Sequence, residues 1–234
     1  MRIETDTELI TFQGWTLRVR PAANAKRLMV LIHGWTGDEN SMWVFTHGFS
    51  SDYWLIAPRA PHVGDPSGYS WRPPHPGTLR QRFDKLNAAA QGSAFGKPSL
   101  ETLKPATDSL ISLVDAYSSS VGLDAKQFDL MGFSQGAAAA ALLALLHPKR
   151  VHKLAVLAGF VPSGTEEIIA KRPLEGKQIF VAHGTKDELV PVERAHVSVE
   201  LLERAGAKVI YCEDDVGHKI SATCLRALES YFAD

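Results

Sequence analysis

A serine lies between two glycines at residues 132–136, in the sequence Gly-Phe-Ser-Gln-Gly. The apolar run 128–131 precedes this motif, and the Ala/Leu-rich segment 137–146 follows it. The pattern predicts a strand, a sharp turn and a helix, with Ser134 exposed at the turn above the edge of a sheet. A serine hydroxyl in that position can attack an acyl carbonyl, provided that a neighbouring base removes its proton.

Two later loops supply a candidate acid and a candidate base. Asp187 follows the apolar run 178–182, and His218 follows the apolar segment 209–212. Because parallel strands end at the same edge of a sheet, side chains on these loops can converge with Ser134. We expect His218 to act as the general base and Asp187 to hold its imidazole in the required tautomer.

Other side chains near these loops have simpler explanations. Asp214 and Asp215 are rivals for the acid, although a solvent-exposed acidic turn is the ordinary interpretation of such a pair. Of the nine histidines, His183 precedes the acid by only four residues and is expected to shape that turn. His196 falls in a predicted helix, where a surface or core histidine is the ordinary case. The serine, acid and base named above therefore remain the candidates.

The negative oxygen that forms during such an attack needs hydrogen-bond donors placed in advance. The backbone N–H of Gln135, directly after the serine, is one candidate donor. A glycine-rich loop at 33–38 also follows an apolar run, and the backbone N–H of Trp35 is the second candidate. The alternative for this loop is a plain strand-to-helix turn capped by Asp38 or Asn40.

Apolar runs alternate with helical patterns along the chain. Uninterrupted apolar runs suit strands that are buried on both faces of a parallel sheet, and apolar stripes at helical spacing indicate the helices between them. The predicted elements are a hairpin at 9–20, strands at 28–32, 54–57, 154–157 and 179–182, and helices within 110–121, 191–205 and 220–232. We therefore expect one α/β domain over residues 1–234, with a mostly parallel sheet and helices on both faces.

One long segment interrupts this alternation. Residues 58–105 are rich in proline and glycine and contain several aromatic residues, among them Trp71. A connection of this length in a compact domain is usually functional. Its aromatic residues predict a packed flap beside the candidate site.

Composition excludes several classes of function. The net charge of −1 gives no electrostatic basis for binding nucleic acid or an anionic membrane. No stretch is long and apolar enough to span a bilayer, and the first residues lack the apolar centre of a signal peptide. Motifs for metals, nucleotides and dinucleotides are absent, so we expect no metal and no cofactor.

The chain has two cysteines, Cys212 and Cys224. Two cysteines do not make a disulfide framework. We therefore expect both to be reduced thiols in a cytoplasmic protein.

Taken together, these motifs resemble a known family. The matching blocks follow one another at similar separations over most of the chain, at 33–40, 132–137, 183–192 and 217–220. They resemble the phospholipase/carboxylesterase family of α/β-hydrolases, which includes bacterial carboxylesterases and the acyl-protein thioesterases. The resemblance implies a compact, often dimeric α/β-hydrolase acting on carboxylic esters. It places the catalytic residues on Ser134, Asp187 and His218, and the oxyanion donors on the main chain of Trp35 and Gln135.

The segment 58–105 departs from the family pattern, because family members have a shorter and different stretch there. Trp71 matches a tryptophan that they carry near the pocket, so we expect it to line the substrate pocket. Trp35 is bulkier than the aliphatic residue common at its place, which would narrow the acyl pocket. Substrate preference is thus the property that the resemblance fixes least.

We expect a serine hydrolase that cleaves small carboxylic esters with short to medium uncharged acyl groups. A thioesterase or a lysophospholipase is the alternative within hydrolases. A binding protein that kept the fold and lost the chemistry is a third hypothesis, although such proteins usually lack a member of the triad. The resemblance also implies a possible homodimer.

Overall fold

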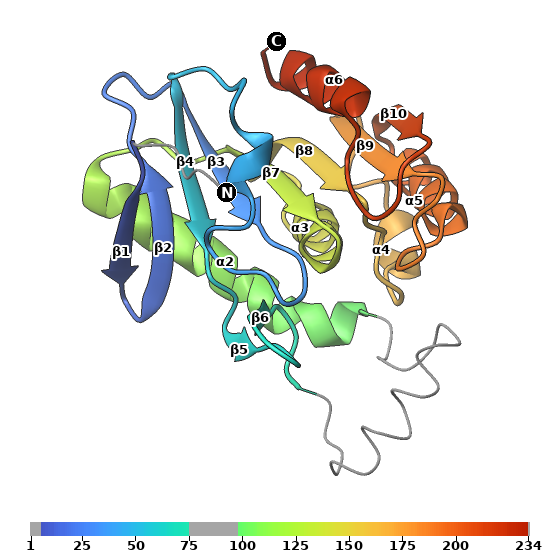
Figure 1. Cartoon of the computed structure of the whole chain (residues 1–234), viewed down its shortest axis with the longest axis horizontal. Helices are drawn as coiled ribbons and strands as arrows, with labels where there is room; N and C mark the ends of the chain where they lie inside the picture. The colour runs from blue at the N-terminus through green and yellow to red at the C-terminus, as the bar shows by residue number, and fades with distance from the viewer. Residues whose placement is uncertain (1–5, 75–97, 234) are drawn as a thin grey trace.

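The computed structural model describes residues 6–74 and 98–233. The strands of its main sheet are β1 (Glu8–Phe12), β2 (Trp15–Arg20), β3 (Arg27–Ile32), β4 (Tyr53–Pro58), β7 (Phe128–Phe133), β8 (Val151–Leu157), β9 (Gln178–Gly184) and β10 (Lys208–Asp214). Their order across the sheet is β1-β2-β4-β3-β7-β8-β9-β10 (Figure 1). Strand β2 pairs antiparallel with β1 and β4, and every other neighbouring pair in this sheet is parallel.

Short elements and helices connect these strands. The small hairpin consists of β5 (His62–Val63) and β6 (Tyr69–Ser70). The helices are η1 (Trp43–Phe45), α2 (Leu100–Val121), α3 (Gln135–Leu146), α4 (Glu166–Ile169), α5 (Val192–Arg204) and α6 (Ala222–Ala233).

Helices cover both faces of the sheet, as its side-chain alternation shows. In β3, Leu28, Val30 and Ile32 belong to a core shared with α2 and α3. Met29 and Leu31 point the other way, into a core shared with α6 and the segment around η1. Both faces are therefore buried, which explains why the apolar runs have no polar interruption. The predicted mostly parallel sheet with helices on both faces is confirmed.

Only part of the predicted flap can be described, because residues 75–97 of the segment 58–105 lie outside the described residues. Before that gap, the segment contains the β5–β6 hairpin. After it, α2 begins at Leu100, so the last residues of the predicted segment are helical. Ser99 caps this helix, since its side chain accepts from the Thr102 amide and the Thr102 side chain accepts from the Ser99 amide.

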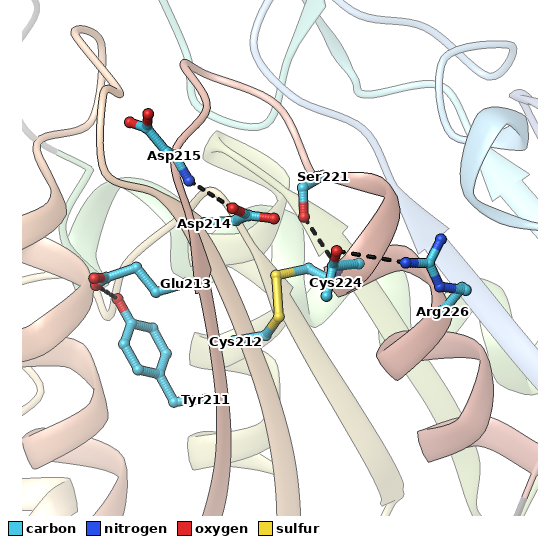
Figure 2. The surroundings of a disulfide bond; sticks show 9 residues. Tyr211, Cys212, Glu213, Asp214, Asp215, Ser221, Cys224 and Arg226 are labelled. Carbon is cyan, nitrogen blue, oxygen red and sulfur yellow. Dashed lines mark hydrogen bonds between the residues drawn. A yellow bond between two sulfur atoms is a disulfide. The ribbon is translucent and has the colours of Figure 1, made fainter.

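The expectation of two reduced thiols is wrong. Cys212 in β10 and Cys224 in the first turn of α6 form a disulfide, with Cα atoms 5.6 Å apart (Figure 2). The start of α6 packs against β10, which the spacing of two cysteines does not reveal. The argument from thiols for a reducing compartment is therefore lost, and a cytoplasmic location stays a prediction.

Among the described residues, none of the helices has the length and apolar character needed to cross a membrane.

Candidate active site

Ser134 lies in a tight turn between the end of β7 and the start of α3. Its backbone has φ 53° and ψ −118°, a conformation that a residue with a side chain rarely adopts. The Ser134 amide is fixed by a 2.9 Å hydrogen bond to the Leu157 carbonyl in β8. A Cβ atom on Gly136 would overlap the carbonyl oxygens of Ile32 and His33, so the turn needs glycine at that position.

The loop after β3 passes directly over this serine. A Cβ atom on Gly34 would lie 3.3 Å from the Cβ atom of Ser134, so the loop backbone is close to the hydroxyl-bearing side chain. Trp35 follows Gly34 in this loop. Gln135 is the first residue of α3, where a backbone N–H has no partner inside the helix. Gly34, the neighbour of Trp35, thus lies close to Ser134, and Gln135 directly follows this serine, while the roles of Trp35 and Gln135 as donors stay a prediction.

The predicted acid and base are in direct contact. Nδ1 of His218 lies 2.6 Å from Oδ2 of Asp187, whose side chain is fully buried. A carboxylate only accepts hydrogen bonds, so Nδ1 carries the proton in this pair. Nε2 of His218 is then the nitrogen that is able to accept a proton.

The other oxygen of Asp187 is held by its own loop, residues 185–191, which we call the acid loop. Oδ1 accepts hydrogen bonds from the amides of Leu189 (2.9 Å) and Val190 (2.8 Å). Burial alone would raise the pKa of Asp187, but the hydrogen bonds from His218, Val190 and Leu189 outweigh burial and lower the net pKa. The carboxylate is therefore charged at neutral pH.

Residues 213–223 run from the end of β10 through the connecting turn into the start of α6 and carry His218, and we call this segment the histidine loop. The His218 ring lies against the ring of Phe133, with centroids 5.0 Å apart. Phe133 is the residue directly before Ser134. The imidazole thus lies beside the turn that presents the serine, and only 17% of the His218 side chain is exposed.

Asp215 and His196 are engaged away from the candidate site, whereas His183 contacts the acid loop. Asp215 pairs with Lys186 at 2.8 Å, and both side chains are largely exposed. His196 hydrogen-bonds Glu213 at the surface, at 2.7 Å. The buried His183 has its Nε2 2.7 Å from the Val190 carbonyl oxygen and 3.4 Å from Oδ2 of Asp187. The interpretation of His183 as a residue that shapes this turn therefore agrees with its contacts.

Trp71, the predicted pocket residue, has a fully buried side chain. Its indole N–H donates to the carbonyl oxygen of His33 at 2.7 Å, and its ring packs on the His33 ring with centroids 5.1 Å apart. A role for Trp71 in the pocket stays a prediction. What the contacts establish is that Trp71 supports the loop that passes over Ser134.

Two further side chains, those of Gln135 and His33, organise this region. The Gln135 side chain accepts a 2.8 Å hydrogen bond from the backbone amide of Trp71. The residue after the serine therefore also binds the backbone that directly follows β6. His33 accepts from the Ala60 amide at 3.0 Å through Nε2 and therefore donates through Nδ1 to the Gly34 carbonyl, at 2.7 Å. The motif blocks contained both residues, but nothing in their spacing indicated these partners.

No group of three or more histidine, cysteine, aspartate or glutamate side chains within residues 6–74 and 98–233 is arranged to hold a metal ion.

Comparison with known proteins extends the resemblance. The model of the phospholipase/carboxylesterase family matches residues 18–233. Carboxylesterase SOBER1 of Arabidopsis thaliana is 35% identical over 116 residues, which is 47% of this chain and 49% of that protein. A probable carboxylesterase, SOBER1-like, from the same plant is 31% identical over 120 residues and 43% of its length. The chain thus spans about half the length of the curated relatives it matches.

Solved structures share the fold over almost the whole chain. Esterase PE8 superposes with a TM-score of 0.72 and 24% identity, covering 92% of this chain and 96% of its own. A carboxylesterase from Mesorhizobium loti gives a TM-score of 0.75 and 20% identity, covering 97% and 99%. The predicted α/β-hydrolase fold is confirmed. Because the family match extends over most of the sequence, this chain belongs to the phospholipase/carboxylesterase family.

Proposed function

We propose that this chain hydrolyses carboxylic esters through an acyl-enzyme formed on Ser134. The observation that carries the proposal is the 2.6 Å contact between His218 Nδ1 and the buried carboxylate of Asp187, beside the strained turn of the serine. The contact leaves Nε2 of His218 able to accept a proton, and the His218 ring packs on Phe133, the residue directly before Ser134. Membership of the phospholipase/carboxylesterase family supports the same reaction class.

In the first half of the proposed reaction, His218 Nε2 takes the proton of the Ser134 hydroxyl as its oxygen attacks the acyl carbon. The carbonyl oxygen becomes negative and accepts hydrogen bonds from the backbone N–H groups of Trp35 and Gln135. The partial positive charge at the start of α3 favours the same oxygen. Collapse of this intermediate breaks the ester C–O bond, and His218 returns the proton to the departing alcohol.

In the second half, water replaces the alcohol. His218 removes a proton from water as the water oxygen attacks the acyl carbon. Collapse of this second intermediate breaks the bond between the acyl carbon and Ser134 Oγ, His218 returns the proton to Oγ, and the carboxylic acid is released. Asp187 keeps the imidazole oriented and stabilises its positive charge in both halves.

The direct test is hydrolysis of p-nitrophenyl acetate. We expect turnover by the wild type and a loss of at least about 1000-fold in kcat for Ser134→Ala, because the nucleophile is removed. A Ser134→Ala rate equal to that of the wild type would rule the proposal out.

The substrate class is proposed to be short to medium uncharged acyl esters. The net charge near zero supports an uncharged acyl group, and a bulky Trp35 in the loop after β3 supports a pocket of limited size. A series of oxygen esters and thiol esters from acetyl to dodecanoyl measures this directly. We expect kcat/KM to decline at the longer chains, whereas a maximum at dodecanoyl, or faster cleavage of thiol esters, would favour a lysophospholipase or a thioesterase.

A further inference from the structure

The disulfide Cys212–Cys224 encloses the histidine loop. Cys212 lies near the end of β10, Cys224 lies in the first turn of α6, and His218 is midway between them in sequence. Figure 2 shows Ser221 and Cys224 at the start of α6, beside the end of β10. The bond therefore closes a covalent loop that contains the proposed base.

The first half of the histidine loop is fastened to the acid loop by backbone hydrogen bonds. The Thr185 amide donates to the Asp214 carbonyl at 2.9 Å, and the Lys186 amide donates to the Val216 carbonyl at 3.0 Å. The Lys186 ammonium also pairs with Asp215. This half is thus held to the loop that carries the buried carboxylate.

The second half lacks such fastening. In the described part of the chain, the hydrogen bonds of residues 219–223 stay within the histidine loop or reach into α6. The Lys219 amide donates to the Gly217 carbonyl, and the Ser221 side chain accepts from the first turn of α6. Ile220 is only partly buried against the core. The position of this half therefore depends on where α6 begins.

The far end of α6 is tied to the sheet by packing and hydrogen bonds. The Phe232 carbonyl accepts from the Tyr53 hydroxyl at 3.1 Å, and the Tyr231 hydroxyl donates to the Gln178 carbonyl at 2.8 Å. At the near end, the covalent tie to the sheet is the disulfide, through the buried Cys224.

We propose that the disulfide Cys212–Cys224 positions the active site. It fixes the second half of the histidine loop, so that His218 keeps its hydrogen bond to Asp187 and is oriented toward Ser134. The inference rests on the proposed role of His218 as the base. Without the bond, the enclosed segment gains conformational freedom. Displacement of a base by about 1 Å is enough to cost on the order of 100-fold in rate.

The test compares wild type with the double variant Cys212→Ser/Cys224→Ser on p-nitrophenyl acetate, at a temperature well below unfolding of both. We expect kcat to fall by about 10- to 100-fold, with KM within twofold, because the base is displaced while the acyl pocket remains. The rate at which a fluorophosphonate labels Ser134 should fall in parallel.

Reduction of the wild type gives the same comparison without mutation. A dithiothreitol thiolate attacks one sulfur of the disulfide, and its second thiol then closes the reagent into a cyclic disulfide. Two electrons and two protons pass to the protein, leaving two thiols. We expect kcat to fall as thiols appear and to recover on reoxidation with oxidised glutathione, whereas dithiothreitol should not change the double variant.

Tyr231→Phe is the matched control, because it removes the hydroxyl contacts at the far end of α6 and leaves the histidine loop intact. It should lower thermal stability with kcat unchanged. A purely structural disulfide would behave in the same way, with a lower melting temperature and a wild-type kcat, and that result would overturn the proposal. Unfolding of both the double variant and the reduced wild type at the assay temperature would also overturn it.

Two reference variants separate this inference from the proposed function. If Ser134→Ala and His218→Ala are inactive while the disulfide-free protein keeps a wild-type kcat, only the positioning role fails. If Ser134→Ala retains wild-type activity, the proposed function itself fails.

Discussion

At the scale of single residues, the proposed chemistry depends on the charge of Asp187. The side chain is fully buried, yet its pKa lies below the ordinary range because three hydrogen bonds outweigh the effect of burial. A charged carboxylate at this position requires His218 to carry its proton on Nδ1. The histidine is thereby held in the tautomer that leaves Nε2 basic.

Replacement of Asp187 by asparagine tests this dependence. The amide has nearly the same shape but no charge, and its NH₂ group is able to donate to an Nδ1 that has lost its proton. We expect kcat for p-nitrophenyl acetate to fall by about 1000- to 10,000-fold, with KM little changed.

Asp215→Asn is the matched control, since Asp215 was the rival acid and pairs with Lys186 at the surface. Its kcat should stay within twofold of the wild type. Equal losses in the two variants would contradict the assignment of the acid.

The sequence allowed some of these residues to be predicted and not others. Ser134, Asp187 and His218 follow strand patterns in a characteristic order, and the structure brings the acid and the histidine together. The supporting contacts of His33 and Gln135 could not be predicted, because their partners Ala60 and Trp71 belong to a segment without periodic pattern.

At the scale of elements, the short strand β6 supports the loop that passes over the serine. The Tyr69 amide donates to the Gly37 carbonyl, and the Tyr69 carbonyl accepts from the Thr36 amide. Trp71, two residues after Tyr69, donates hydrogen bonds to the Gln135 side chain and to the His33 carbonyl. The segment 69–71 therefore contacts both the loop that contains Trp35 and the side chain of Gln135.

Trp71→Phe tests this support, because it removes the indole N–H that donates to the His33 carbonyl and keeps an aromatic ring. We expect the free energy of unfolding to fall by about 1 kcal/mol. Since the loop then loses a fixed carbonyl next to Gly34, kcat should also fall, by about tenfold.

Trp43→Phe removes an equivalent buried bond, from its indole N–H to the Glu39 carbonyl at 2.8 Å. This control should lose similar stability and keep its kcat. If both variants lose kcat to the same extent, β6 has no specific role in holding the donors.

Most strands and helices followed from apolar patterns, but two features of these elements did not. The β5–β6 hairpin has strands of two residues each, which are too short to carry a period. Helix α2 begins before Pro105, a residue that favours a loop. Its cap pairs Ser99 with a threonine instead of the usual glutamate or glutamine, so the capping signal in the sequence is weak.

At the scale of the whole molecule, buried histidines couple stability to pH. Burial lowers the pKa of His33, which accepts a hydrogen bond from Ala60 and must stay neutral to do so. Burial likewise lowers the pKa of His183. In the unfolded chain both residues bind protons as the pH falls below about 6.5. The unfolded state then holds more protons than the folded state, so acid favours unfolding.

We therefore expect the urea midpoint of unfolding to be lower at pH 5 than at pH 7. The urea midpoint should decrease a second time below about pH 4. The pKa of Asp187 is lower in the folded protein than in the unfolded chain, so the unfolded chain binds this proton first and acid again favours unfolding. Circular dichroism during urea titration measures both steps. Identical midpoints at pH 5 and pH 7 would mean that the buried histidines do not contribute.

If His218 activates the hydroxyl of Ser134, a fluorophosphonate probe should react with that hydroxyl. We expect one adduct per chain, which mass spectrometry of the digested protein maps to Ser134. Labelling should be at least about 1000-fold slower in a folded His218→Ala variant. An adduct on another residue, or equal labelling rates in wild type and variant, would show that His218 does not activate Ser134.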